Sequence, residues 1–276
     1  MFDRLEVLLK HFSVSADMFH AGALCGINDI GFEDGSGQLH LVRQGTVAVS
    51  HSGRTVIQVT EPSLLLYPRP LPHRFISDQE QGADFTCARL FFDGGVANPI
   101  AATLPAFICL PLSEVTGAEG VLELLFEEAF LQRCGRRALV NRLFEVVLIQ
   151  ILRHLMESGQ IKTGMLAGMA HPQLRYALVA MHKQPAVLWS LEMLADNAGM
   201  SRSVFANTFR DTVGCTPGIY LQRWRIALAQ QALKRGQPLK IIAIDVGYGS
   251  EAALSRAFKA QTGLSPREWK QQLQQQ

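Results

Sequence analysis

The sequence predicts a two-domain α+β protein, in which a β-barrel or sandwich with a helical hairpin precedes an all-helical domain. Three observations predict this fold class. Residues 1–110 hold short aliphatic and β-branched runs between turns, two helical patterns follow, and a helix–glycine–helix pattern occurs twice in residues 171–276. With 276 residues, the chain is longer than one typical domain.

Five segments of the N-terminal half are predicted to be strands. They are rich in Val, Ile, Leu and Thr, and they end at Gly, Pro or Ser, as strands commonly do. Short strands that recur every 8–12 residues or so are typical of a barrel or a sandwich. The predicted strands are Gln38–Val42, Thr46–Ser50, Thr55–Val59, Ser63–Tyr67 and Phe85–Phe92.

Two helices are predicted next, over residues 121–130 and 139–155, with Gly135 in their connection. The second helix is apolar on more than one face. One barrel face cannot cover so much apolar surface, so we expect a homodimer through this helix; full burial within one chain is the alternative. The residues off the main apolar stripe are Phe144, Leu148 and Leu152.

Glycine-rich sequence separates the two halves, which we place at residues 1–160 and 172–276 with a linker at 161–171. Residues 1–170 contain 13 Lys and Arg against 18 Asp and Glu, whereas residues 171–276 contain 13 against 6. The basic C-terminal half predicts a nucleic-acid contact confined to that end, although ordinary solvated surfaces also show charge differences of this size.

Neither a membrane helix nor a targeting segment is expected. The most apolar stretch, residues 139–155, is interrupted by charged side chains and is shorter than the roughly 18–20 apolar residues of a membrane span. The first residues lack a signal-peptide pattern, so we expect a cytoplasmic protein. The five cysteines form no CxxC pair, so neither a disulfide framework nor a structural metal site is expected.

A helix–turn–helix pattern occupies residues 191–213. A short apolar helix ends at Gly199, whose backbone freedom suits a tight turn. Ser201 is placed to cap a second helix, and Phe205 and Phe209 form its core-facing side. One such pattern is weak evidence, because many helical hairpins look alike.

The same pattern returns 49 residues later, over residues 239–262. Gly247 is the turn glycine, Ser250 is the cap, and Leu254 and Phe258 form the apolar pair. The first copy continues into Gly-Cys-Thr-Pro and the second into Gly-Leu-Ser-Pro. Two matching copies in the basic half predict a tandem helix–turn–helix domain that binds DNA.

Residues 171–276 resemble the DNA-binding domain of the AraC/XylS family. The resemblance implies a transcription regulator, usually an activator, that binds double-stranded promoter DNA and works with RNA polymerase. Leu254 and Trp269 depart from the usual Phe and Tyr at packing positions. The matching residues include Ala198-Gly199-Met200-Ser201, Thr216-Pro217, Tyr220-Leu221 and Arg225, then Val246-Gly247-Tyr248, Gly263 and Ser265-Pro266.

By this resemblance, the exposed start of each recognition helix reads bases and neighbouring cations contact phosphates, which position the protein without specifying sequence. Each of these side chains could instead be ordinary helix surface. The residues expected to read bases are Ser203, Ala206 and Asn207 in the first helix, and Glu251, Ala252, Ser255 and Arg256 in the second. Those expected to contact phosphates are Arg202, Arg210, Lys240 and Lys259.

The N-terminal half resembles a cupin barrel, on residues 39–45, 68–75 and 98–105. Enzymatic cupins hold a metal with a His-x-His pair, a carboxylate and a further histidine, but here only His40 and His73 match. We therefore expect no metal, no other cofactor and no enzyme activity. A cupin enzyme fused to a DNA-binding module is the alternative. We expect His40, His73 and Arg89 to line an effector pocket instead.

A further resemblance, to the reactive-chlorine-responsive members of this family, covers nearly the whole chain. It implies that Cys25 and Cys87 sense an oxidant, which converts a thiolate to a sulfenic acid that a nearby thiol can trap. The sequence does not establish that the two thiols are adjacent, and both could be packing residues. A small organic effector bound in the barrel would be a different signal, and constitutive DNA binding would need no signal.

Overall fold

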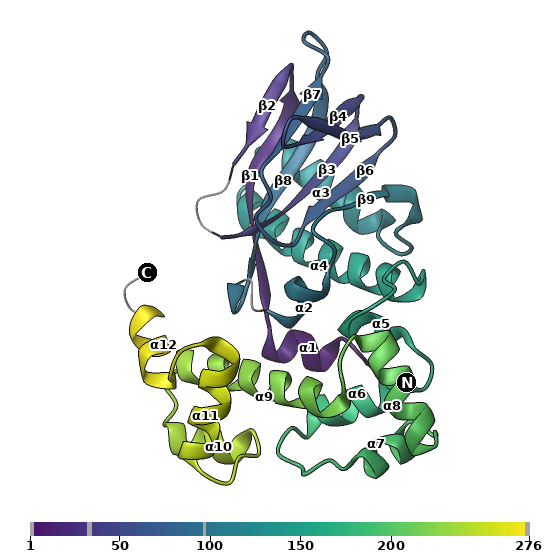
Figure 1. Ribbon diagram of the computed structural model, residues 1–276. Coiled ribbons are helices and arrows are strands. Elements are labelled where there is room, and N and C mark those ends of the chain that lie inside the picture. Colours follow the sequence, from purple (N-terminus) through teal and green to yellow (C-terminus); the bar gives the residue numbers. More distant parts are fainter. Residues whose placement is uncertain (1–2, 32–34, 96–97, 274–276) are drawn as a thin grey trace. The chain divides into compact units, whose positions relative to one another are not determined.

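The computed structural model describes residues 3–31, 35–95 and 98–273 (Figure 1). The chain divides into a barrel unit, Val14–Val96 with Leu104–Ser158, and a helical unit, Met1–Ser13 with Ala97–Thr103 and Gly159–Gln276. The predicted fold class, a β-rich domain with a helical hairpin followed by an all-helical domain, is confirmed.

The helical unit includes three stretches that were not predicted to belong to it, residues 1–13, residues 97–103 and the expected linker. Helix α1 (Glu6–His11) packs on α6 (Leu174–Lys183), and the Arg4 guanidinium donates to the Met169 carbonyl at 3.0 Å. The expected linker, residues 161–171, contains helix α5 (Met165–Ala170), whose residues are buried except for Ala170. Both helices are too short to show a helical period in the sequence, so the structure differs from the predicted boundaries there.

The barrel unit consists of two antiparallel sheets. The first has the strand order β1-β8-β3-β6-β9 and the second β2-β7-β4-β5, and their facing sides share an apolar core. The strands are β1 (Val14–Leu24), β2 (Ile27–Ile30), β3 (Gly37–Gln44), β4 (Val47–His51), β5 (Arg54–Val59), β6 (Ser63–Tyr67), β7 (His73–Ser77), β8 (Ala83–Phe92) and β9 (Ile108–Pro111).

All five predicted strands are present, as β3, β4, β5, β6 and β8. Strands β1, β2, β7 and β9 were not predicted from the sequence. Strand β1 contains Ala, Gly and Asp residues of low strand propensity, and it lies at a sheet edge, where alternation of buried and exposed positions is weak.

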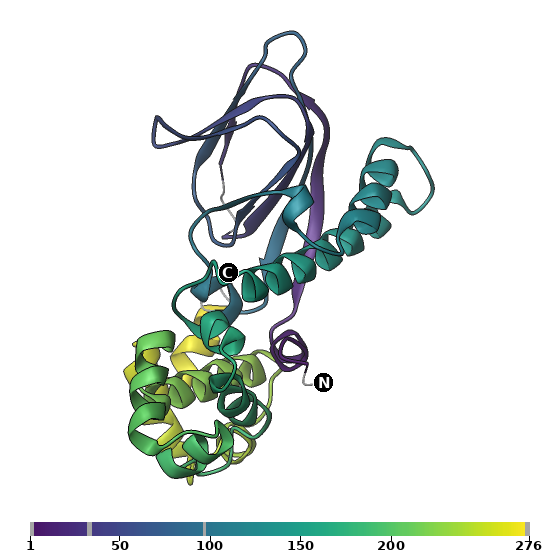
Figure 2. The same cartoon turned by 90° about the vertical axis from the view of Figure 1, so that its right-hand side faces the viewer.

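The predicted hairpin is formed by α3 (Glu119–Phe130) and α4 (Arg136–Glu157), and Gly135 between them has a φ of +79°. The long α4 helix passes beside β1 (Figure 2). Phe144, Leu148 and Leu152, the basis for expecting a homodimer, have exposed fractions of 0%, 1% and 0%. These three side chains therefore give no support to a homodimer, although Leu139 and Val146 of the same helix are 40% and 39% exposed. The homodimer stays a prediction.

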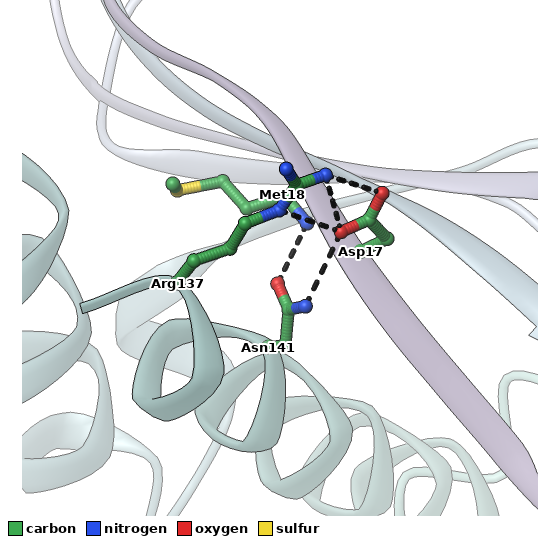
Figure 3. A network of polar contacts seen from close by, with 4 residues as sticks. All are labelled: Asp17, Met18, Arg137 and Asn141. Atoms are coloured by element: carbon green, nitrogen blue, oxygen red, sulfur yellow. Dashed lines mark hydrogen bonds and ion pairs between the residues drawn. The ribbon is translucent and has the colours of Figure 1, made fainter. Parts of the chain in front are cut away.

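Polar side chains of α4 satisfy the free edge of β1 (Figure 3). Asn141 accepts the backbone N–H of Met18 at 2.8 Å and donates to Asp17 at 3.3 Å. Arg137 pairs with the same Asp17 carboxylate at 2.8 Å. These groups cover the edge of β1 near Met18, and a covered strand edge is less available for pairing with another chain.

The helical unit is arranged around the long helix α9, with α7 and α8 near one end and α10 to α12 near the other (Figure 1). In the ranges that the structure describes, no helix is long and apolar enough to cross a membrane. The remaining helices are α2 (Pro99–Thr103), α7 (Leu191–Asn197), α8 (Arg202–Val213), α9 (Pro217–Lys234), α10 (Leu239–Asp245), α11 (Glu251–Thr262) and α12 (Pro266–Leu273).

Candidate DNA-binding surface and barrel core

Helices α7 with α8, and α10 with α11, form the two predicted helix–turn–helix units. The turn glycines have positive φ angles, +62° at Gly199 and +82° at Gly247. The apolar pair of each second helix is fully buried, as predicted: Phe205 and Phe209 in α8, and Leu254 and Phe258 in α11.

Replacing Gly247 with alanine is expected to destabilise the helical unit more than replacing Gly199. Both variants force a side chain into the left-handed region, at a cost of about 1 kcal/mol. At Gly247 the new Cβ would also lie 2.7 Å from the Cα of Ala186, whereas at Gly199 no described atom lies within 4 Å. The clash should cost a further 1–3 kcal/mol or so. Urea unfolding of each variant measures this difference, and equal losses would contradict it.

The caps of the recognition helices differ. Ser250 caps α11, because its Oγ accepts the N–H of Ala253 at 3.2 Å. Ser201 occupies the corresponding position before α8, but its side chain makes no capping hydrogen bond, so that prediction is wrong for its hydroxyl. Helix α7 is the short apolar helix expected before Gly199, but its first residue, Leu191, is 41% exposed.

Each recognition helix exposes a stripe opposite its buried pair. The stripe residues follow one another at three- and four-residue intervals, so they share one helix face. Of the residues predicted to contact DNA, Ala206 and Ser255 are half-buried and the others are exposed. Arg210 donates to the Asn207 side-chain oxygen at 3.3 Å. The stripe in α8 is Arg202, Ser203, Ala206, Asn207 and Arg210, and the one in α11 is Glu251, Ala252, Ser255, Arg256 and Lys259.

Arg225 of α9 joins the two helix–turn–helix units, a role that the sequence analysis missed. Its guanidinium donates to the carbonyls of Pro185 at 2.7 Å and Val187 at 2.9 Å, in the segment before α7. It also donates to the carbonyl of Gly247, the turn glycine of the second unit, at 3.3 Å. The signal available in the sequence was the match of Arg225 to the AraC/XylS pattern.

A neutral histidine is buried beneath α9. His182 Nε2 lies 2.6 Å from the Tyr220 hydroxyl, and the ring stacks on Trp224 with centroids 4.0 Å apart. Burial, helped by nearby His11, lowers the pKa of His182 to about 3. This cluster belongs to the core of the helical unit.

His40 and His73 meet inside the barrel, where their Nε2 atoms are 3.1 Å apart. His73 Nδ1 lies 2.8 Å from the Leu71 carbonyl, which can only accept. Nδ1 therefore carries the proton of neutral His73, and its Nε2 accepts from His40. Burial lowers the pKa of His73 to about 4 and that of His40 well below its usual value, so both rings are neutral at pH 7.

Two more polar rings belong to this cluster, although the sequence analysis did not single them out. Tyr67 stacks on His73 with centroids 3.9 Å apart, and its hydroxyl lies 3.0 Å from His51 Nε2. Arg89, the third residue predicted for the effector pocket, instead lines a cavity of about 680 Å³ beside the start of α4. The structure thus brings the two predicted histidines together in the barrel core, and it places Arg89 at a cavity that they do not line.

The barrel core does not fit a catalytic cupin metal. Among the described residues, no three His, Cys, Asp or Glu side chains are grouped so as to hold a metal. His40 and His73 supply two nitrogens at most, and catalytic sites use three or more protein ligands.

Cys25 and Cys87 are not brought together. The register of β1 with β8 pairs Cys87 with His20, and Cys25 lies five residues further along the chain. At a rise of about 3.3 Å per residue, their Cα atoms are roughly 16 Å apart, whereas a disulfide needs about 7 Å or less. Cys25 is exposed, but Cys87 is buried, and burial raises the pKa of its thiol well above the usual value.

Comparison with known proteins matches both halves of this architecture. A cupin family model matches residues 3–157, and a helix-turn-helix domain model matches residues 194–272. The chain is 38% identical over 171 residues to a putative AraC-like transcription regulator of Streptomyces antibioticus, which covers 60% of this chain and 56% of that relative. The chain belongs to the AraC family of transcription regulators, with an N-terminal cupin domain.

The family expected from the sequence is thus confirmed, although the chain spans about half the length of the Streptomyces antibioticus relative. Other known proteins match more of the chain. The RCS-specific transcriptional activator RclR of Escherichia coli is 26% identical over 251 residues, covering 87% of this chain and 88% of its own. The crystal structure of ToxT from Vibrio cholerae O395 is 11% identical, with a TM-score of 0.40 and coverage of 95% of this chain and 97% of that one.

Proposed function

We propose that this AraC-family regulator binds a specific duplex DNA site by placing α8 and α11 in successive major grooves. The repeated exposed stripe carries this proposal, because both helices present the same positions opposite the same buried pair. Successive grooves on one face of DNA lie about 34 Å apart. The expected operator therefore has two half-sites, about one helical turn apart.

Asn207 and Arg256 occupy equivalent positions of the two stripes, and we assign them the strongest base readout. Asparagine pairs with the N6 and N7 atoms of adenine, and arginine with O6 and N7 of guanine. The Arg210 guanidinium orients the Asn207 amide and leaves one lone pair of its oxygen for DNA. Ala206 and Ala252 can contact only a thymine methyl group. The proposed phosphate contacts are Arg202, Arg210, Lys240 and Lys259.

Replacing Arg256 with alanine is expected to weaken binding to the selected operator by about 1–3 kcal/mol and to relax the preference at one base pair. Replacing Lys259 with alanine should weaken binding to all sequences alike and lower the salt slope by about one. Fluorescence anisotropy with operator and scrambled duplexes, over a range of salt concentrations, separates these effects. An equal loss on both duplexes for the Arg256 variant would exclude base reading by this residue.

For the barrel unit, we propose that an oxidant reacts first at Cys25. The thiol is exposed, whereas Cys87 is buried and too far away to trap an oxidised Cys25. Stoichiometric hypochlorite should therefore give a sulfenic acid at Cys25 and no Cys25–Cys87 disulfide. Mass spectrometry identifies the product, with operator affinity measured in parallel for Cys25→Ser and Cys87→Ser. An unchanged affinity in the oxidised wild type would reject thiol sensing and leave an organic effector or constitutive DNA binding as the alternatives.

A further inference from the structure

The helical unit contains a cavity of about 640 Å³ that the proposed DNA contacts do not use. Small-molecule sites commonly have volumes of about 300–1,000 Å³. Helix α9 contributes Arg223 and Trp224 to its wall, α12 contributes Trp269, α5 contributes Met165, and Leu264 comes from the connection after α11. Val213 of α8 and Thr262 of α11 also line it, so both helix–turn–helix units border the cavity.

We propose that this cavity binds a small organic anion with a flat apolar body, and that binding changes the affinity for DNA. The second half of this inference rests on the proposed DNA-binding function. Trp224 and Trp269, with Met165 and Leu264, provide aromatic and aliphatic surface for the apolar body. Arg223 is the one side chain of formal charge among the described lining residues, so charge complementarity selects an anion.

Two polar groups of the wall are available to a ligand. Among the described residues, Arg223 has no ion-pair partner, and its exposed guanidinium can hold a carboxylate or sulfonate through two N–H groups. The indole N–H of Trp224 has no hydrogen-bond partner in the described chain, although the side chain is only 3% exposed. A ligand acceptor beside Trp224 would satisfy this donor.

The position of the cavity explains how a ligand would act on DNA binding. Val213 ends α8, and Gln261 and Thr262 end α11, and all three line the cavity. A ligand there touches both recognition helices at the ends opposite their proposed base-reading residues. The two recognition helices must fit successive grooves at the same time, so operator affinity depends on the spacing between α8 and α11. A ligand that binds more tightly at one spacing of these helices therefore shifts the affinity for the operator.

The probe for this test is 8-anilinonaphthalene-1-sulfonate, a flat apolar molecule with one negative charge. Two of the three tryptophans line the cavity, so bound probe should quench tryptophan emission with a one-to-one end point. Arg223→Gln should weaken binding of the probe roughly five- to twentyfold. Arg235→Gln, an exposed arginine at the end of the same helix and outside the lining, should leave the affinity unchanged.

The uncharged analogue N-phenyl-1-naphthylamine tests the role of charge, and it should bind wild type and Arg223→Gln equally. At a concentration that saturates the wild type, the sulfonate probe should shift the operator affinity of the wild type several-fold. At the same probe concentration, the operator affinity of Arg223→Gln should not change. Equal probe affinity in the Arg223 and Arg235 variants would overturn the site, and an unshifted operator affinity would overturn its regulatory role. If the wild type without probe bound no operator, the proposed DNA-binding function would be refuted instead. The probe titration measures the cavity alone and does not depend on DNA binding.

Discussion

Replacing Arg225 with methionine is expected to lower the free energy of unfolding of the helical unit by about 3 kcal/mol or more. Methionine retains the length and apolar stem of arginine, but it cannot donate to the carbonyls of Pro185, Val187 and Gly247. Each half-buried carbonyl that loses a charged donor costs about 1 kcal/mol or more. Urea unfolding followed by tryptophan emission reports on this unit alone, because Trp189, Trp224 and Trp269 all lie in it.

Two variants control this measurement. Arg235→Met removes an exposed arginine from the same helix and should change stability by about 0.5 kcal/mol at most. Arg225→Lys keeps the positive charge but cannot reach carbonyls on two sides at once, so an intermediate loss is expected. A loss below about 1 kcal/mol in Arg225→Met would show that the two helix–turn–helix units do not depend on this side chain.

The helical unit should also lose stability steeply as the pH falls below 6.5, because folding keeps His182 neutral. The pKa of His182 is about 3 in the folded protein, whereas an unfolded chain titrates near 6.5. Between these two pH values, the unfolded state therefore binds a proton at His182 and the folded state does not. This contribution to stability is complete above pH 6.5, and it falls by up to about 1.4 kcal/mol per pH unit as the pH approaches 3.

The variant His182→Phe removes the titrating group and keeps an aromatic ring against Trp224. It should be less stable at about pH 7.5, because the Tyr220 hydroxyl loses its partner. Between about pH 6 and 4, the stability of the variant should fall less steeply than that of the wild type. The difference between the two slopes should be about 1.4 kcal/mol per pH unit. Carboxylates contribute equally to both proteins, so parallel slopes would show that His182 does not cause the acid sensitivity.

The elements that could be predicted from the sequence are those with a strong local pattern. The strands β3 to β6 and β8 consist of aliphatic runs between turn residues, and the turn glycines and buried pairs of the two repeats identify both recognition helices. Strand β1 was missed because polar groups of α4, distant in the sequence, complete its edge. Local propensity carries no information about such a contact.

The predictions that failed or stayed incomplete depend on contacts between distant residues. The apolar faces of α4 suggested a partner chain, but Phe144 and its neighbours are buried within the same chain. The cysteines fitted a family pattern, yet the strand register separates Cys25 from Cys87. Arg225 stood in a matched motif, but only the fold shows which three carbonyls it joins.

Selection of binding sites from a random duplex library tests most directly whether two recognition helices of one chain read two half-sites. Full-length wild type, Asn207→Ala and Arg256→Ala would be selected in parallel at about 0.15 M salt, a concentration that limits non-specific binding. The wild type should select two sequence blocks with centres about 10–10.5 base pairs apart. Asn207→Ala should lose the preference in one block, and Arg256→Ala in the other. A single block, or loss of the same block in both variants, would contradict the two-helix account.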